Sequence, residues 1–258
     1  MTMDDGRWLV VNADDFGRTP GVTEGIIEAH RAGIVTSASL MVRWPGSEEA
    51  AAYARASGLG LGLHLDLGEW VHGPDGWEAV YEVVATPDAD AVTAEVANQL
   101  GRFHKLLGRS PTHIDSHQHV HRAEPARAAV LGFARRLGIP VREVTGGVHY
   151  CGGFYGQLGD GTPYPEGITV ANLVSLLDGL VPGITELSCH PGTAADDSVY
   201  SDERRRELAV LCDPAVRAAL VERDITLVSF AALSPLGADV FGLRGAPAQQ
   251  GAPVASAH

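Results

Sequence analysis

The sequence predicts an α/β fold, a single deformed (β/α) barrel of the TIM type with about seven parallel strands. Three observations support this class. Short apolar runs alternate with helical patterns along the whole chain, the composition shows no break, and 258 residues is a length that α/β barrels use as one unit. Because such alternation builds right-handed βαβ units, we expect one closed or nearly closed barrel.

The first three strands are predicted from apolar runs of β-forming residues. These runs are "RWLVVN" (7–12), "IVTSASLMV" (34–42) and "LGLGLHLDL" (59–67). A helix over 19–33 has Thr19 as N-cap, Pro20 at its first position and Gly33 at its end, and a second helix over 45–58 ends at Gly58. The glycines of the third strand predict a backbone that another group approaches closely.

The rest of the chain continues the alternation after a long loop predicted from residue 66 to about 89. We expect helices over 88–108, 124–138, about 168–180 and 202–223 (broken by Pro214), strands over 111–115, 139–144, 184–190 and 225–230, and a glycine-rich loop over 145–167. The barrel domain is assigned to residues 1–244. The Ala/Pro/Gln/Gly-rich tail over 245–258 is predicted to be disordered.

Composition excludes several classes of partner. The formal net charge is −13, from 32 acidic and 19 basic residues, so nucleic acid and anionic membrane are poor partners. The first residues lack the pattern of a signal peptide, and no apolar run reaches the roughly 18 to 20 residues of a membrane span. The three cysteines fit no pairing or metal spacing. We therefore expect a cytoplasmic protein with reduced thiols.

Polar residues collect where the predicted strands end, which is where α/β barrels place their active sites. Carboxylates and histidines recur at this end, together with an asparagine and an arginine: Asn12, Asp14 and Asp15, then His64 and Asp66, the histidine cluster, Arg142 and Glu143, and His190. We expect these side chains to converge. The other histidines (His30, His72, His104 and His149) are predicted to be structural.

The stretch "HIDSHQHVH", residues 113–121, holds four histidines and an aspartate. If it is extended, its odd-numbered residues share one face, and only two neighbours can reach one ion. If the chain coils after Ser116, His117 and His121 could chelate from one helical face. Either geometry predicts one or two metal ligands, and the remaining members hold those ligands or touch substrate. Of the adjacent aspartates, Asp15 fits an ion-bound carboxylate and Asp14 a proton acceptor.

Several pieces, in this order, resemble the YdjC-like (ChbG/HpnK) carbohydrate deacetylases. They are "VNADDFG" (11–17), "GIIEAHRAGIVTSASLMV" (25–42), "GLHLDL" (62–67), "PTHIDSHQHVH" (111–121), "FYG" (154–156) and "CHPG" (189–192). The resemblance covers the chain to about residue 230. It implies a deformed (β/α) barrel that hydrolyses the N-acetyl group of an amino sugar with a divalent metal.

Carried over to this chain, the resemblance implies Asp15, His64 and His117 as metal ligands, Asp14 as catalytic base and His190 as candidate general acid. We assign substrate binding or support of the ligands to Asp115, His119, His121, Arg142 and Tyr155. The family often has a histidine where this chain has Gln118. We expect little consequence, because that side chain alternates away from the face of residues 117 and 119.

The leading hypothesis is therefore hydrolysis of an N-acetylglucosamine-type mono- or oligosaccharide by metal-activated water. An Asp/His/His set suits zinc, and magnesium, cobalt, nickel or manganese are alternatives. The rival hypotheses are a metal-dependent phosphoester hydrolase, and a sugar-binding or regulatory barrel without turnover. A homodimer is expected only on the base rate for soluble proteins.

Overall fold

The computed structural model describes residues 6–73, 76–193, 200–234 and 240–243. One parallel sheet runs in the order β6-β3-β2-β1-β8-β7, and β9 pairs with the first residues of β1. Its strands are β1 (Arg7–Phe16), β2 (Ser37–Leu40), β3 (Gly60–Leu65), β6 (Ile114–Ser116), β7 (Val148–Cys151), β8 (Gly183–Cys189) and β9 (Ile225–Leu227). The predicted α/β class and the seven parallel strands are confirmed.

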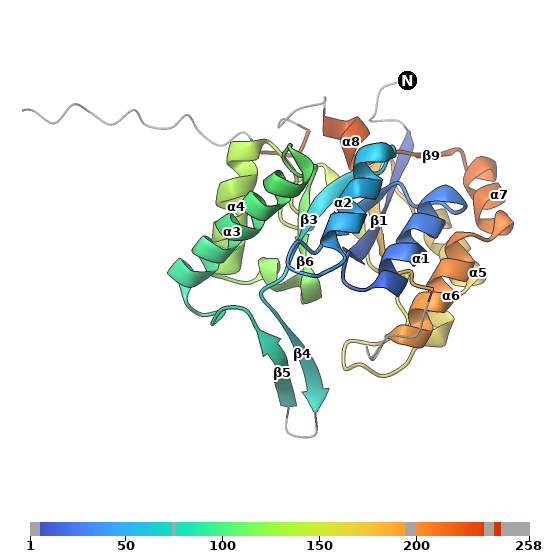
Figure 1. Cartoon of the computed structure of the whole chain (residues 1–258). Coiled ribbons are helices and arrows are strands. Elements are labelled where there is room, and N and C mark those ends of the chain that lie inside the picture. Colours follow the sequence, from blue (N-terminus) through green and yellow to red (C-terminus); the bar gives the residue numbers. More distant parts are fainter. Residues whose placement is uncertain (1–5, 74–75, 194–199, 235–239, 244–258) are drawn as a thin grey trace, which may run out of the picture.

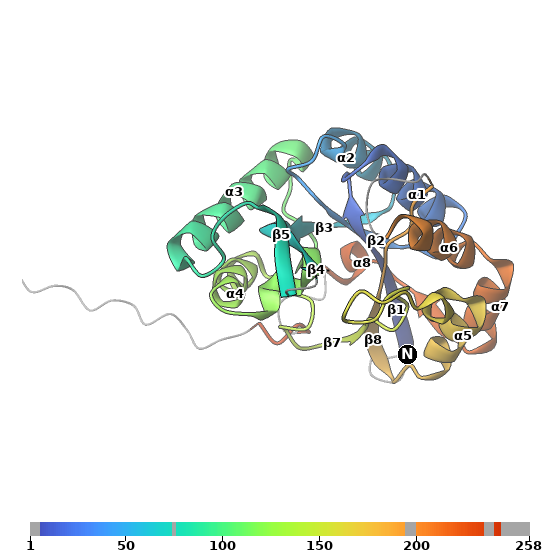
Figure 2. The same ribbon diagram turned by 90° about the horizontal axis from the view of Figure 1, so that it is seen from below.

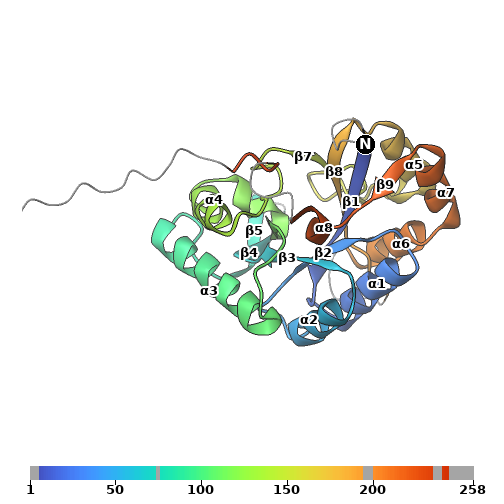
Figure 3. The same ribbon diagram turned by 90° about the horizontal axis from the view of Figure 1, so that it is seen from above.

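The sheet curls into a half-barrel with the long helices around its outer side (Figures 1, 2 and 3). These helices are α1 (Pro20–Arg31), α2 (Ser47–Ala56), α3 (Ala89–Leu107), α4 (Ala126–Leu137), α5 (Val170–Asp178), α6 (Ser201–Leu211) and α7 (Pro214–Glu222). The short helix α8 (Phe230–Leu233) and the 3₁₀ turns η1 (His117–Arg122) and η2 (Pro165–Ile168) complete the described elements. Thr19 caps α1 by accepting a hydrogen bond from the Val22 amide, as its sequence predicts.

The glycines of β3 are needed for close packing inside the half-barrel. A Cβ atom on Gly62 would lie 2.4 Å from the imidazole of His113, and one on Gly60 would lie 2.7 Å from the Ser37 hydroxyl. This confirms the predicted close approach to the third strand. The His113 ring in turn stacks on Phe230 at 4.0 Å between centroids.

The loop predicted over residues 66 to 89 is wrong in its central part. An antiparallel hairpin lies there, formed by β4 (Gly68–Gly73) and β5 (Gly76–Glu82). It projects from the carboxyl-end side of the sheet (Figure 1). The two segments, "GEWVHG" and "GWEAVYE", are short, mostly exposed or half-buried and without a clear period of two, and turn signals lie beside them.

The strand predicted over 139–144 is also absent. Val141 makes one parallel bridge to Ile114, and Glu143 then adopts a left-handed conformation (φ 56°). The Val144 and Thr145 amides both bond back to the Val141 carbonyl, so the chain turns instead of extending. The seventh strand is β7, within the predicted glycine-rich loop, and no described strand joins it to β6. The half-barrel is therefore open between these two edges.

The expected tail over residues 245–258 lies outside the described residues. Within them, Cys151, Cys189 and Cys212 are free thiols. None of the described helices has the length and apolar character needed to cross a bilayer.

Candidate active site

A β-bulge at the end of β1 turns two adjacent aspartates into the same site. Ala13 and Phe16 pair with Ala38 and Leu40 of β2, so three steps on β1 oppose two on its neighbour. Asp15 takes a left-handed conformation (φ 67°) at this point. Successive residues on a regular strand point to opposite faces, and the bulge is what allows Asp14 and Asp15 to line one cavity.

Asp15, His64 and His117 offer ligand atoms that all lie within 4.8 Å of one another. From Asp15 Oδ1, His64 Nε2 is 3.3 Å away and His117 Nδ1 is 3.2 Å away. This oxygen is buried and has no hydrogen-bond partner among the described residues. One carboxylate and two imidazoles around an unsatisfied oxygen are a suitable donor set for a divalent ion.

The charge balance at these residues also favours a cation. Burial opposes protonation of His64, but the carboxylates of Asp115 and Asp15 outweigh it and raise the pKa of His64 to about 10. In the same way the pKa of His117 is raised, against burial, by Asp15 and Glu69. The carboxylates around His64 and His117 thus stabilise positive charge at these two rings, and a bound divalent ion would supply that charge in place of protons.

A second group, formed by Asp14, His64 and Asp115, is equally compact but already holds a cation. The buried guanidinium of Arg142 donates to both oxygens of Asp14 at 2.6 and 2.7 Å and lies 2.7 Å from Asp115 Oδ2. It also donates to Glu186 at 2.8 and 2.9 Å. Asp115 in addition lies 2.8 Å from His64 Nδ1, which leaves Nε2 facing Asp15.

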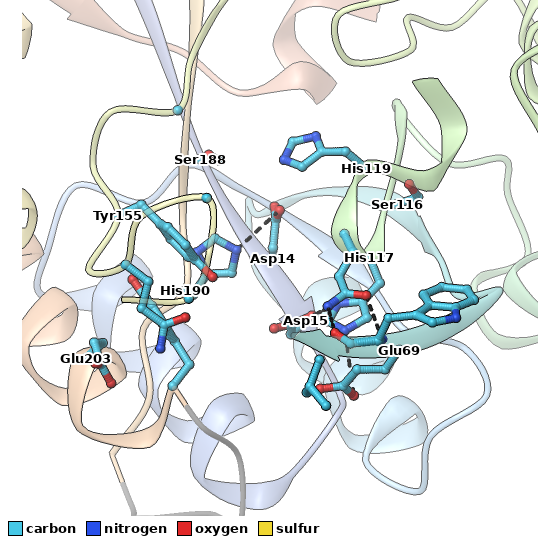
Figure 4. A pocket seen from close by; sticks show the side chains of 18 of the residues that line it. Asp14, Asp15, Glu69, Ser116, His117, His119, Tyr155, Ser188, His190 and Glu203 are labelled. Atoms are coloured by element: carbon cyan, nitrogen blue, oxygen red, sulfur yellow. Dashed lines mark hydrogen bonds and ion pairs between the residues drawn. The ribbon is translucent and has the colours of Figure 1, made fainter. Parts of the chain in front are cut away.

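Asp14 is therefore an ionised carboxylate held in place by an arginine. Burial alone would raise its pKa, but the charge and hydrogen bonds of Arg142 lower it below its ordinary value. At neutral pH it can accept a proton. His190 Nε2 lies 3.7 Å from Asp14 Oδ2, on the side away from His117 (Figure 4).

His190 packs edge-on against a stacked pair of tyrosine rings, Tyr155 and Tyr200. Tyr155 lies edge-on to it at 5.2 Å between centroids and stacks on Tyr200 at 4.6 Å. The backbone amide of His190 donates to Glu207. Burial lowers the pKa of His190 to about 4, so the imidazole is neutral near pH 7.

These groups share a cavity of about 760 Å³ at the carboxyl end of the strands. Asp14, Asp15, His64, His117 and His190 line its inner part. The β4–β5 hairpin lines one part of the wall, and residues 155 and 157–161 with Pro163 line another. A volume of this size suits a small-molecule substrate.

The histidine cluster divides into separate roles. The chain coils after Ser116, as one of the two alternatives predicts. His117 and His121 nevertheless do not face one ion from a helical surface, because Gln118 and His119 adopt left-handed conformations (φ 50° and 54°). His119 lines the cavity near Tyr150. His121 is buried against the Ser116 hydroxyl and the Arg142 carbonyl, so it supports the loop instead of reaching the cavity.

Several residues at the site were either not singled out from the sequence or expected to play no part there. Glu69 lies 3.7 Å from His117 Nε2 and pairs with Arg18, and Arg204 donates to Asp15 Oδ2 at 2.5 Å. Gln118 binds the hairpin backbone, and His72, predicted to be structural, lines the cavity. Arg204 sits in the charged run "SDERRRE", which reads as a solvated helix face. The sequence gives no sign that Arg204 and Glu207, three residues apart in this run, are buried.

Comparison with known proteins gives one family and several relatives. Residues 8–222 match the model of the YdjC-like protein family. A carbohydrate deacetylase of Geobacillus stearothermophilus is 35% identical over 87% of this chain and 97% of its own length. A chitooligosaccharide deacetylase of Serratia marcescens is 31% identical over 87% of this chain and 98% of its own.

Several solved structures have a fold similar to that of this chain. One from Enterococcus faecalis V583, named provisionally for cellobiose-phosphate cleavage, has a TM-score of 0.71 at 29% identity and covers 88% of this chain and 99% of its own. A family 4 carbohydrate esterase of Streptomyces lividans, in complex with acetate, has a TM-score of 0.52 at 9% identity and covers 86% and 92%. At that identity the second likeness concerns the fold alone.

Proposed function

The chain belongs to the YdjC-like family, and we propose that it is a carbohydrate deacetylase that hydrolyses the N-acetyl group of an N-acetylglucosamine-type sugar. Relatives of 35% and 31% identity, named carbohydrate and chitooligosaccharide deacetylase, match over nearly their whole lengths. The observation that carries the proposal is the meeting of Asp15, His64 and His117 within 4.8 Å, beside the ionised Asp14, in one cavity.

We assign Asp15, His64 and His117 to a divalent ion. When bound, the ion supplies a Lewis acid for the acetyl carbonyl and lowers the pKa of water. Zinc suits the Asp/His/His set, and magnesium, cobalt, nickel and manganese are the alternatives. Asp115 fixes the ring of His64 through Nδ1, and Arg204 holds the second oxygen of Asp15.

Asp14 is the proposed general base. Arg142 keeps it ionised and fixes its direction, so that it can take the proton from water as the carbonyl is attacked. Its Oδ2 atom lies 3.7 Å from His190 Nε2, so the proposed base and the proposed acid are neighbours in the cavity. The low pKa of His190 makes its protonated form a strong acid, which suits donation to the leaving amine.

The charges of the cavity favour an uncharged sugar. Among the described residues that line it, the arginines Arg18 and Arg204 are paired with Glu69 and Asp15. Lys105, the single lysine of the sequence, lies in the last turn of α3. A phosphate group usually needs an arginine or lysine clamp, so these pairings weigh against the phosphoester alternative.

The test measures acetate and phosphate release in parallel. The protein is incubated with N-acetylglucosamine, its β-1,4-linked oligomers and a panel of sugar phosphates, with and without exhaustive chelation. We expect acetate from the N-acetylated sugars, loss of activity on chelation, and recovery with a divalent ion. Phosphate release without acetate would support the rival hydrolase. Tight sugar binding without either product would support the non-catalytic barrel.

A further inference from the structure

The base of the β4–β5 hairpin is fastened to the segment that carries His117. The Gln118 side chain donates to the Trp70 carbonyl at 2.7 Å and accepts from the Trp70 amide at 2.9 Å. Arg18 pairs with Glu69 at 2.6 Å and lies 3.3 Å from His117 Nε2. The premise that the Gln118 side chain only points away from the site is therefore wrong, because it binds the backbone of the hairpin that lines the cavity.

One face of the hairpin is aromatic. Trp70 pairs with Ala79 and His72 pairs with Trp77, so Trp70, His72 and Trp77 lie on the same face of the strand pair. All three line the cavity. Trp77 is nevertheless 61% exposed, whereas tryptophan is mostly buried on average, so most of its indole is accessible to a ligand in the cavity.

This face extends outward from the inner part of the cavity. Glu69 touches His117, and His72 follows three residues later along β4. At about 3.4 Å per residue the His72–Trp77 pair lies about 10 Å further along the hairpin, a distance that about two pyranose rings span. The aromatic face thus begins beside the proposed reaction centre and continues to where a second or third sugar would lie.

We propose that Trp70, His72 and Trp77 form a binding platform for the sugar units beside the one that is deacetylated, so that the protein selects N-acetylated oligosaccharides over monosaccharides. This proposal rests on the proposed function. The C–H face of a pyranose ring is apolar and flat, and stacks on an aromatic side chain without needing charge. Trp77 is already exposed and its ring contacts His72 edge-on, so no buried side chain has to open for a sugar to reach it.

A sugar chain fits this face better than a second copy of the protein. The platform is continuous with the cavity, because all three of its residues line the cavity wall. Two copies of a chain with net charge −13 also repel one another. Val80 is exposed and lies on β5, the strand that carries Trp77, but it does not line the cavity. It therefore provides a matched control.

The test compares Trp77→Ala with Val80→Ala, whose parent side chains are 61% and 57% exposed. Acetate release gives kcat/KM for N-acetylglucosamine and for its trimer, and the ratio of the two measures length selectivity. Trimer affinity is also measured by calorimetry in chains that carry Asp14→Asn, so that the probe is not consumed. We expect wild type and Val80→Ala to prefer the trimer, and Trp77→Ala to lose about tenfold of that preference.

The outcomes separate this inference from the proposed function. Equal length selectivity in all three proteins overturns the platform while acetate release still supports the deacetylase. Length-dependent binding that needs Trp77, without acetate from any sugar, supports the platform and contradicts the deacetylase. A change of oligomeric state in Trp77→Ala but not in Val80→Ala, seen by light scattering, assigns the face to a second copy and overturns the inference.

Discussion

Replacing Asp14 by asparagine removes a negative charge and a proton acceptor while keeping the shape of the side chain. In the wild-type protein both oxygens of Asp14 accept from Arg142, at 2.6 and 2.7 Å, and Oδ1 accepts from Asn12 at 2.9 Å. An asparagine can keep the interactions of one oxygen but places an NH₂ group where the other oxygen was. It cannot take a proton from water.

Two magnitudes follow from this geometry. Loss of a general base lowers kcat by roughly 10²- to 10⁴-fold. Arg142 keeps Asp115 and Glu186 as partners, so its buried charge is not left uncompensated. The stability loss is therefore about 1 to 3 kcal/mol, as for one buried polar group without a partner.

The assay measures kcat with saturating N-acetylated trimer, bound metal per chain and melting temperature, on Asp14→Asn and on Asp15→Asn. Asp15 is the matched comparison, because it is adjacent in sequence and equally buried. Its substitution removes a carboxylate from the three proposed ligands, so metal content and activity should fall together. Asp14→Asn should retain its metal and lose activity alone.

Two results would refute this division of roles. Turnover of Asp14→Asn near the wild-type rate would exclude Asp14 as the base. Parallel loss of metal in both variants would mean that Asp14 also holds the ion, in conflict with its pairing to Arg142.

Three further predictions concern other parts of the site. His190→Asn should lower kcat for acetate release while metal content stays at the wild-type level, because His190 contacts Asp14 and not the ligand set; loss of metal would contradict this. Gly62→Ala should lower the free energy of unfolding by roughly 1 to 3 kcal/mol, since its Cβ would lie 2.4 Å from the His113 ring. Gly58→Ala is the control, because a Cβ atom there has no neighbour within 4 Å. Equal urea midpoints for the two variants would show that the packing around Gly62 is looser than described. Burial lowers the pKa of His113 from 6.5 to about 4, so the unfolded chain binds a proton at a higher pH than the folded one, and the free energy of unfolding should fall as pH drops from 6.5 towards 4. In His113→Asn, the free energy of unfolding measured in urea should depend less on pH over this range. The same pH dependence in wild type and variant would exclude His113 as its cause.

The parts of the fold that the sequence predicts well are those with strong periodic patterns and clear ends. The cap at Thr19 and the apolar runs of β1 and β3 are local features, and they appear where expected. The strand expected over 139–144 failed because the left-handed conformation of Glu143 is set by its surroundings. The hairpin was missed because turn residues flank two short strands that are only partly buried.

The candidate site divides in the same way. Polar residues at strand ends predicted the neighbourhood of Asp14, Asp15, His64 and His117, because parallel strands end at one edge of the sheet. Their catalytic and metal-binding roles stay predictions. Arg204 was missed because its burial depends on how α6 packs, and the role of Gln118 was missed because it depends on a left-handed backbone.

Reconstitution of the metal-free protein tests the central claim most directly. Protein purified without added metal is analysed for its native ion, stripped by chelation, and titrated with zinc or another divalent ion while acetate release from the N-acetylated trimer is followed. The three converging side chains predict that activity rises in proportion to bound ion and stops at one ion per chain. Full acetate release from the stripped protein would contradict the account.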